Sequence, residues 1–83
     1  MVLSNNDKEI LKALSILGYK YVAKDSNNSI FAFNKKPEKK DFQWDVDNLN
    51  TRYAELDNNV LLFLNWDDNE PFDIEKFFKE GDK

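Results

Sequence analysis

The heptapeptide Val60-Leu61-Leu62-Phe63-Leu64-Asn65-Trp66 contains the only five adjacent apolar residues in the chain. Turn-forming residues flank it, with Asp57-Asn58-Asn59 before it and Asp67-Asp68-Asn69-Glu70-Pro71 after it. A short apolar run with turn residues at both ends is typical of a strand buried on both faces. We therefore predict that Val60–Trp66 is the central strand of a small sheet with helices on one face.

A helix is expected near the N-terminus, over Ser4–Leu17. Ser4, Asn5 and Asn6 are all suitable N-caps. Both Ser4 with Asp7 and Asn6 with Glu9 have the spacing of a capping box, in which each side chain binds the backbone N–H of the other residue. Gly18 follows where a left-handed residue commonly ends a helix. The stripe that would face the core consists of Ile10, Leu14 and Leu17.

A second helix is expected near the C-terminus. Asp73 is a suitable N-cap, and Phe72 and Phe77 have the spacing of a hydrophobic staple. The apolar face of this helix would hold Ile74, Phe77 and Phe78, and Gly81 would end it.

Four further segments read as strands or remain open. Tyr19–Lys24 and Ser29–Asn34 alternate in the manner of a β-hairpin, with Asn28 placed to adopt a left-handed turn conformation. Asp41–Val46 is expected to be a third strand with Phe42, Trp44 and Val46 on one face. Asp47–Asn59 fits an irregular loop or a short helical turn equally well.

These elements predict one α+β domain over residues 1–83. Its order is α-β-β-β-β-α, in a two-layer sandwich with a mainly antiparallel sheet and helices at both ends. The length of 83 residues fits a single domain of this kind.

Composition restricts the chemistry that this domain is expected to perform. The chain has no cysteine and no histidine, so thiol chemistry and the most common metal ligand and proton shuttle are missing. No apolar run approaches the ~20 residues of a membrane span. We expect a cytoplasmic protein that is not an enzyme and that has no catalytic residues, no cofactor and no membrane partner.

Charge is divided unevenly along the chain. Residues 1–40 hold eight lysines against four acids, whereas residues 41–83 hold twelve acids against four basic residues. An acidic face of this kind can attract a basic groove on a partner protein, while aromatic anchors supply affinity. The expected acidic surface consists of Asp45, Asp47, Glu55, Asp57, Asp67, Asp68 and Glu70.

The lysines allow a second interpretation. Basic residues interleaved with aromatic residues are typical of single-strand nucleic-acid surfaces, although lysines also protect exposed edge strands from aggregation. The alternative nucleic-acid-binding set consists of Lys20, Lys24, Lys35, Lys36, Lys39 and Lys40.

The densest group of acids, Asp67-Asp68-Asn69-Glu70, also allows two interpretations. Carboxylates close together in one loop can bind a hard cation such as Ca²⁺. The spacing does not match an EF-hand loop, and a solvated turn before a helix explains the same residues. We therefore predict no metal site.

Three segments together resemble a known group of proteins. They are Leu14-Ser15-Ile16-Leu17-Gly18-Tyr19-Lys20-Tyr21-Val22-Ala23-Lys24-Asp25, then Ser29-Ile30-Phe31-Ala32-Phe33 with Lys36-Pro37, and Phe63-Leu64-Asn65-Trp66-Asp67-Asp68-Asn69-Glu70-Pro71-Phe72-Asp73-Ile74. The chain looks like small phage- and prophage-encoded proteins of low-GC Gram-positive bacteria, in which an LGYKY hairpin precedes a tryptophan and a W-D-EP segment closes the chain. The matching motifs are structural, so the resemblance transfers no catalytic residue.

This resemblance implies a protein that acts inside an infected or lysogenic bacterial host. Small phage accessory proteins often act by binding a host or phage protein, and an anti-CRISPR-like inhibitor of a host defence nuclease is the sharpest form of that function. A monomer or a weak homodimer formed through a sheet edge is expected.

Overall fold

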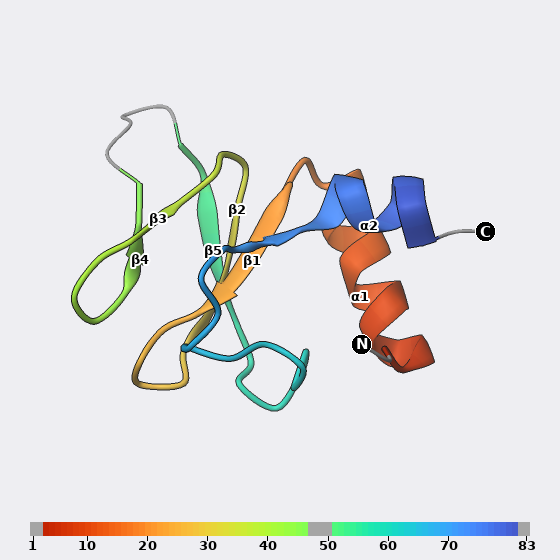
Figure 1. Cartoon of the computed structure of the whole chain (residues 1–83). Helices are drawn as coiled ribbons and strands as arrows, with labels where there is room; N and C mark the ends of the chain where they lie inside the picture. Colours follow the sequence, from red (N-terminus) through yellow and green to blue (C-terminus); the bar gives the residue numbers. More distant parts are fainter. Residues whose placement is uncertain (1–2, 47–50, 82–83) are drawn as a thin grey trace.

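The computed structural model describes residues 3–46 and 51–81, which form two helices and six strands (Figure 1). The elements are α1 (Asn5–Ile16), β1 (Tyr21–Lys24), β2 (Ile30–Phe33), β3 (Glu38–Lys39), β4 (Trp44–Asp45), β5 (Tyr53–Leu56), β6 (Phe72–Asp73) and α2 (Ile74–Gly81). This arrangement confirms the expected α+β class, with antiparallel strands between an N-terminal and a C-terminal helix.

The two ends of α1 follow directly from local sequence. The Ser4 hydroxyl accepts a hydrogen bond from the Asp7 N–H at 3.1 Å, and the Asp7 carboxylate accepts one from the Ser4 N–H at 3.1 Å. At the other end Gly18 has φ +97°, and the Tyr19 N–H reaches the Leu14 carbonyl at 2.9 Å. These contacts form the expected capping box and a Schellman-type stop. Leu17, expected in the buried stripe, is 61% exposed.

Helix α2 also begins as its sequence predicts. The Asp73 carboxylate accepts a hydrogen bond from the Lys76 N–H at 2.9 Å, as an N-cap should. The ring centroids of Phe72 and Phe77 lie 5.6 Å apart, which confirms the hydrophobic staple. Neither helix of the described chain is long and apolar enough to span a bilayer.

The main sheet has four antiparallel strands in the order β5-β2-β1-β6. Strands β1 and β2 form the expected hairpin, and Asn28 in their turn has φ +72°. Strand β5 pairs with β2, so neither the irregular loop nor the helical turn expected within Asp47–Asn59 is correct for Tyr53–Leu56. Residues 47–50 of that segment lie outside the described residues.

The prediction of a central strand over Val60–Trp66 is wrong. The backbone turns repeatedly there, as shown by hydrogen bonds from the N–H of Leu64 to the carbonyl of Leu61 and from the N–H of Asp68 to the carbonyl of Asn65, both 3.1 Å. Leu61 is fully buried with φ +52°, whereas Leu62 is 70% exposed. The run is apolar because Leu61 and Leu64 reach inward from a loop, and no strand pairs with it.

The prediction of a strand over the whole of Asp41–Val46 is also wrong in extent. Only Trp44 and Asp45 form a strand, β4, which pairs with β3 in a separate two-stranded ribbon. A turn closed by a hydrogen bond of 2.8 Å from the Lys40 N–H to the Gln43 carbonyl interrupts the alternation. Phe42 is therefore 76% exposed and does not share the buried face of Trp44.

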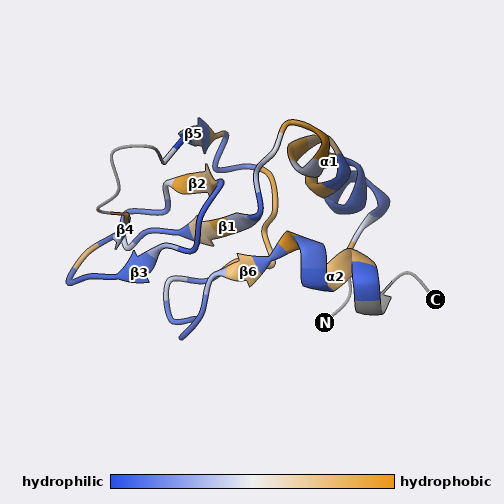
Figure 2. Cartoon of the chain, turned by 90° about the horizontal axis from the view of Figure 1, so that it is seen from above, coloured by the Kyte–Doolittle hydropathy of each residue, from blue (hydrophilic) through white to orange (hydrophobic). Residues whose placement is uncertain are grey.

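The main sheet has two differently covered faces (Figure 2). Helices α1 and α2 and the 60–64 loop cover one face, which we call the helix face. The β3–β4 ribbon lies against the opposite face, which we call the ribbon face. The core on the helix face contains Leu3, Leu11, Leu14, Val22, Ile30, Ala32, Leu61, Leu64 and Ile74. The ribbon face has its own smaller cluster, built on Ala23, Phe33 and Trp44.

Candidate functional site

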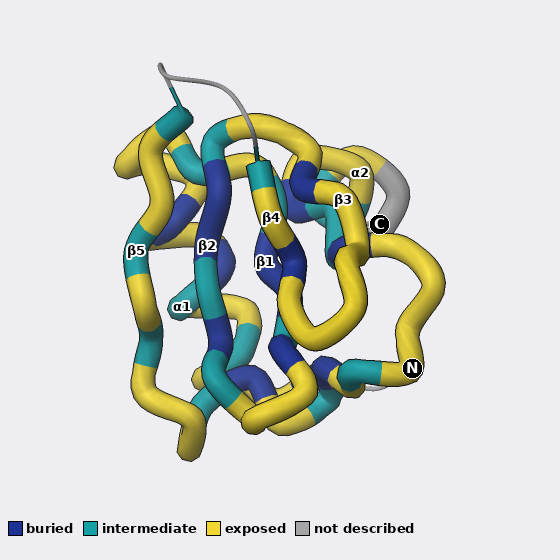
Figure 3. The backbone as a smooth tube through the Cα atoms, turned by 90° about the vertical axis from the view of Figure 1, so that its left-hand side faces the viewer, coloured by how far each residue is buried: buried dark blue, intermediate teal, exposed yellow. Residues whose placement is uncertain are grey.

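The ribbon face is only partly covered. In Figure 3 the ribbon lies in front of β1, while β2 and β5 lie beside it without main chain over them. The alternation of β2 and β5 directs Phe31, Phe33, Tyr53 and Glu55 to this face, with Phe33 opposite Tyr53 and Phe31 opposite Glu55. A half-covered face of this kind leaves aromatic side chains at the margin of the ribbon.

A cavity of about 250 Å³ lies between this sheet surface and β4. The Phe31 ring centroid is 6.1 Å from that of Tyr53 and 6.3 Å from that of Phe33. Tyr53 remains 64% exposed, so the cavity is accessible from solvent on the β5 side. We call this the ribbon cavity, and its lining consists of Asp25, Phe31, Phe33, Gln43, Trp44, Asp45, Val46 and Tyr53.

Asp25 fixes the ribbon against the sheet. Its Oδ1 atom accepts a hydrogen bond of 2.9 Å from the backbone N–H of Trp44, and the indole N–H of Trp44 donates to the Lys24 carbonyl at 3.1 Å. The Ser26 hydroxyl donates to the Phe42 carbonyl at 2.7 Å. These contacts place the Trp44 ring on the sheet and set the width of the ribbon cavity.

The environment of Asp25 is unusual for a carboxylate. The residue is 6% exposed, and burial raises its pKa above the ordinary value. The hydrogen bond from Trp44 acts in the opposite direction, while the negative charges of Asp45 and Glu55 raise the pKa further. The negative charges of Asp45 and Glu55 therefore act on the buried carboxylate of Asp25, which lines this small cavity.

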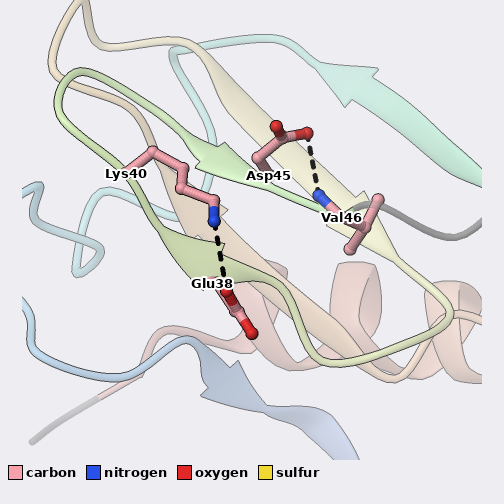
Figure 4. Close-up of polar contacts among 4 residues, drawn as sticks. All are labelled: Glu38, Lys40, Asp45 and Val46. Atoms are coloured by element: carbon pink, nitrogen blue, oxygen red, sulfur yellow. Dashed lines mark hydrogen bonds and ion pairs between the residues drawn. The ribbon is translucent and has the colours of Figure 1, made fainter.

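Asp45 occupies the ribbon strand that lines the cavity (Figure 4). Its Oδ1 atom accepts a hydrogen bond of 2.8 Å from the Val46 N–H. Glu38 stands opposite Asp45 in the ribbon, and Figure 4 shows Lys40 reaching Glu38, at 3.2 Å, rather than Asp45. Within residues 3–46 and 51–81, neither Asp25, Asp45 nor Glu55 takes part in an ion pair.

The other acids expected on a partner-binding surface lie elsewhere. Asp57 accepts a hydrogen bond of 2.8 Å from the Asn59 N–H in the turn after β5. Asp67 is exposed in the loop before β6, and in the same loop Asp68 accepts one of 3.1 Å from the Asn65 N–H. Glu70 forms an ion pair of 3.1 Å with Lys36. Asp47 lies outside the described residues. Of the described acids in the expected set, Asp45 lines the ribbon cavity and Glu55 acts on Asp25 through its charge.

Most of the lysines expected in a nucleic-acid surface have intramolecular partners. Lys20 pairs with Glu75 at 3.6 Å, and Lys36 and Lys40 form the ion pairs described above. The Lys39 ammonium lies 4.4 Å from the ring centroid of Trp66 and donates to the carbonyl oxygens of Trp66 and Asp68. Lys24 is half-buried in β1, and Lys35 is exposed.

A larger open groove of about 860 Å³ lies beside β6 and α2. Phe63, Phe72 and Phe77 are among its lining residues. Charges of both signs also line it, including Lys36, Lys76, Asp68, Glu70 and Asp73, so it favours no ligand charge. The ribbon cavity is the more specific site because its titratable lining is acidic apart from one tyrosine.

The sequence suggested Asp45 and Glu55 as surface acids, but it did not single out Asp25 or the aromatic surface of β2 and β5. Asp25 lies between the two expected hairpin strands, and its burial depends on Trp44, which lies 19 positions later in the chain. The alternation of Phe31 and Phe33 indicated that they share a face, but it did not show that a short ribbon leaves this face half open.

The fold and the ribbon cavity together define a small α+β domain with an acidic, aromatic recess on one sheet face. No protein-family model, curated protein or solved structure matches the chain. In the described part of the chain, no group of three or more acidic side chains is arranged to hold a metal ion.

Proposed function

We propose that this chain is a non-enzymatic, phage- or prophage-encoded protein-binding module. In this proposal it inhibits a host defence nuclease, as anti-CRISPR proteins do, by presenting an acidic surface to the basic groove of the nuclease. The observation that carries the proposal is the ribbon cavity, which Asp25 and Asp45 line together with the exposed ring of Tyr53, while the charge of Glu55 acts on Asp25. The phage origin and the bacterial host rest on the sequence resemblance.

The physical argument is one of complementarity. A nuclease attracts nucleic acid through positive charge, and a carboxylate-bearing surface is attracted to the same groove. Aromatic side chains that are partly exposed, such as Tyr53, are frequent anchors of protein interfaces. The net charge of −4 adds a long-range attraction toward a basic partner.

The test is a binding and cleavage assay with the purified protein and a panel of purified Gram-positive defence nucleases, both RNA-guided and restriction enzymes. We expect one nuclease to form a stoichiometric complex in size-exclusion chromatography and to lose cleavage activity. Glu55→Gln should weaken this complex, whereas Glu9→Gln, the same change on the outer side of α1, should not. Absence of a complex with every nuclease would overturn the proposal.

The same assay separates the nucleic-acid alternative. In this alternative the free protein binds DNA or RNA through its lysines. The binding should then weaken steeply with increasing salt and with Lys→Ala changes at Lys24 and Lys35. Removal of one phosphate-binding lysine should then reduce the slope of log affinity against log salt concentration by about one. That result would contradict a protein-binding role for the acidic surface.

A further inference from the structure

We propose that the ribbon cavity receives the guanidinium group of a single arginine side chain presented by a partner protein. This inference deepens the proposed function, on which it rests for the identity of the partner. Its chemistry is argued from the cavity alone.

The volume of the ribbon cavity indicates the size of its occupant. At about 250 Å³ it lies below the roughly 300–1,000 Å³ that pockets for whole small molecules occupy. The exposed Tyr53 side chain leaves the β5 side open, so an occupant can enter while attached to a larger surface. One long side chain from a partner fits these dimensions, and a cofactor does not.

The charge of the cavity selects a cation. Asp25 is 6% exposed and lines the cavity, yet only its Oδ1 atom has a hydrogen-bond partner among the described residues. The second oxygen is thus available to accept a hydrogen bond, and a charged N–H donor forms a particularly strong one with a carboxylate. Asp45 and Glu55 supply additional negative charge around the same space.

The walls select a flat cation. Phe31 and Tyr53 both line the cavity, and their rings are arranged edge to face at 62°. A guanidinium group stacks on aromatic faces and donates five N–H groups in its own plane, whereas an ammonium is a compact, strongly hydrated charge. Aromatic walls combined with carboxylates on different strands therefore match arginine better than lysine.

The larger groove beside β6 and α2 provides an internal comparison. It is also lined by aromatic rings and carboxylates, but Lys36 and Lys76 line it as well, and Lys36 already neutralises Glu70 at 3.1 Å. Among the described residues, no lysine or arginine lines the ribbon cavity. Of these two sites, the ribbon cavity is therefore the one whose lining acids form no described ion pair.

The test is an NMR titration of the full-length ¹⁵N-labelled protein with a blocked Gly-Arg-Gly peptide. The matched probes replace arginine with citrulline, which has the same shape without the charge, with lysine, and with trimethyl-lysine. We expect binding of about millimolar affinity for the arginine peptide. The shifts should concentrate on the amides of Phe31, Phe33, Tyr53 and Trp44 and on the Trp44 indole N–H.

Two exposed substitutions test the assignment without threatening the fold. Asp45→Asn and Glu55→Gln should each weaken arginine binding about threefold or more, and Asp67→Asn and Glu9→Gln should leave it unchanged. Equal binding of the citrulline peptide, tighter binding of either lysine probe, or shifts located outside the ribbon cavity would each overturn the proposal.

The outcome is independent of the nuclease assay. Arginine binding without any nuclease complex would support this inference and refute the proposed function. A nuclease complex that forms equally well with Asp45→Asn and Glu55→Gln, together with no response to the arginine peptide, would refute this inference alone.

Discussion

The carboxylate of Asp25 accepts a hydrogen bond from the backbone N–H of Trp44 at 2.9 Å, across 19 residues of intervening chain. This hydrogen bond ties the β1–β2 turn to the β3–β4 ribbon and thereby positions one wall of the ribbon cavity. The other oxygen of the same carboxylate has no partner among the described residues. Asp25 is therefore both a structural link and the most buried charge of the candidate site.

Replacement of Asp25 should separate these two roles. Asp25→Ala removes the acceptor of the buried Trp44 N–H, and we expect it to lower the free energy of unfolding by about 1–3 kcal/mol. Asp25→Asn keeps an acceptor oxygen and removes the charge, so its stability at neutral pH should equal or exceed that of the wild type. Urea denaturation followed by tryptophan fluorescence measures both. An equal loss in the two variants would show that the charge, rather than the acceptor, holds the ribbon.

The stability of the fold should depend on the protonation of Asp25. Burial raises the pKa of Asp25 in the folded state, so the folded protein takes up this proton at higher pH than the unfolded chain does. The contribution of Asp25 to the free energy of unfolding therefore rises as the pH falls through the folded-state pKa, and becomes constant below the unfolded-state pKa. Arginine binding should change in the opposite direction, because protonation removes the charge that attracts the guanidinium.

The measurement is the free energy of unfolding of wild type and Asp25→Asn between about pH 7 and about pH 3. Asp45 and Glu55, whose charges act on Asp25, are present in both proteins, so the difference between the two curves isolates Asp25 from their direct contribution. We expect this difference to shift in favour of the wild type as the pH falls. A difference independent of pH would contradict the raised pKa.

In the loop that replaces the expected central strand, substitutions of two neighbouring leucines should have very different effects on stability. Leu61 is fully buried, so Leu61→Ala should lower the free energy of unfolding by about 2–5 kcal/mol through reduced burial and a residual cavity. Leu62 is 70% exposed, so Leu62→Ala should change it by less than about 0.5 kcal/mol. Thermal or urea unfolding of both variants is sufficient. Similar losses from the two neighbours would instead indicate a strand with both faces buried.

Gly18 and Arg52 should be energetically coupled. The Arg52 Nη2 atom donates a hydrogen bond of 2.8 Å to the Leu17 carbonyl. A Cβ atom added at Gly18 would lie only 2.8 Å from the Arg52 Nη2 atom. Gly18→Ala also places a side chain at φ +97°, so we expect a loss of about 1–2 kcal/mol from backbone strain alone. In an Arg52→Ala background the strain remains and the collision disappears. A double-mutant cycle should therefore show a smaller loss from Gly18→Ala in that background than in the wild type.

The sequence predicted the elements whose signals lie within a few residues of one another. The Ser4–Asp7 capping box, the Gly18 stop, the Asn28 turn and the Phe72–Phe77 staple all occur as expected. Each depends on backbone and side-chain groups at most five positions apart. Their local energies agree with the final fold, so they could be identified without knowledge of it.

The prediction failed where an apolar pattern has two physical solutions. The Val60–Leu64 run is compatible with a buried strand and with a turning loop, because either conformation can bury Leu61 and Leu64. The sheet instead takes its outer strands from Tyr53–Leu56 and Phe72–Asp73, whose patterns are weaker. Pairing with β2 and β1 supplies the hydrogen bonds that stabilise them, and that pairing is a property of the assembled sheet.

The sequence by itself thus determined the fold class, the helix ends and the hairpin, together with a supply of acidic and aromatic residues. Only the tertiary structure decided which of them meet. The ribbon covers β1 and leaves the aromatic side chains of β2 and β5 partly uncovered. The hydrogen bond from the Trp44 N–H holds the Asp25 carboxylate in the interior. The physical reason is that burial and charge proximity depend on contacts between residues far apart in the chain, whereas caps and turns depend on neighbours.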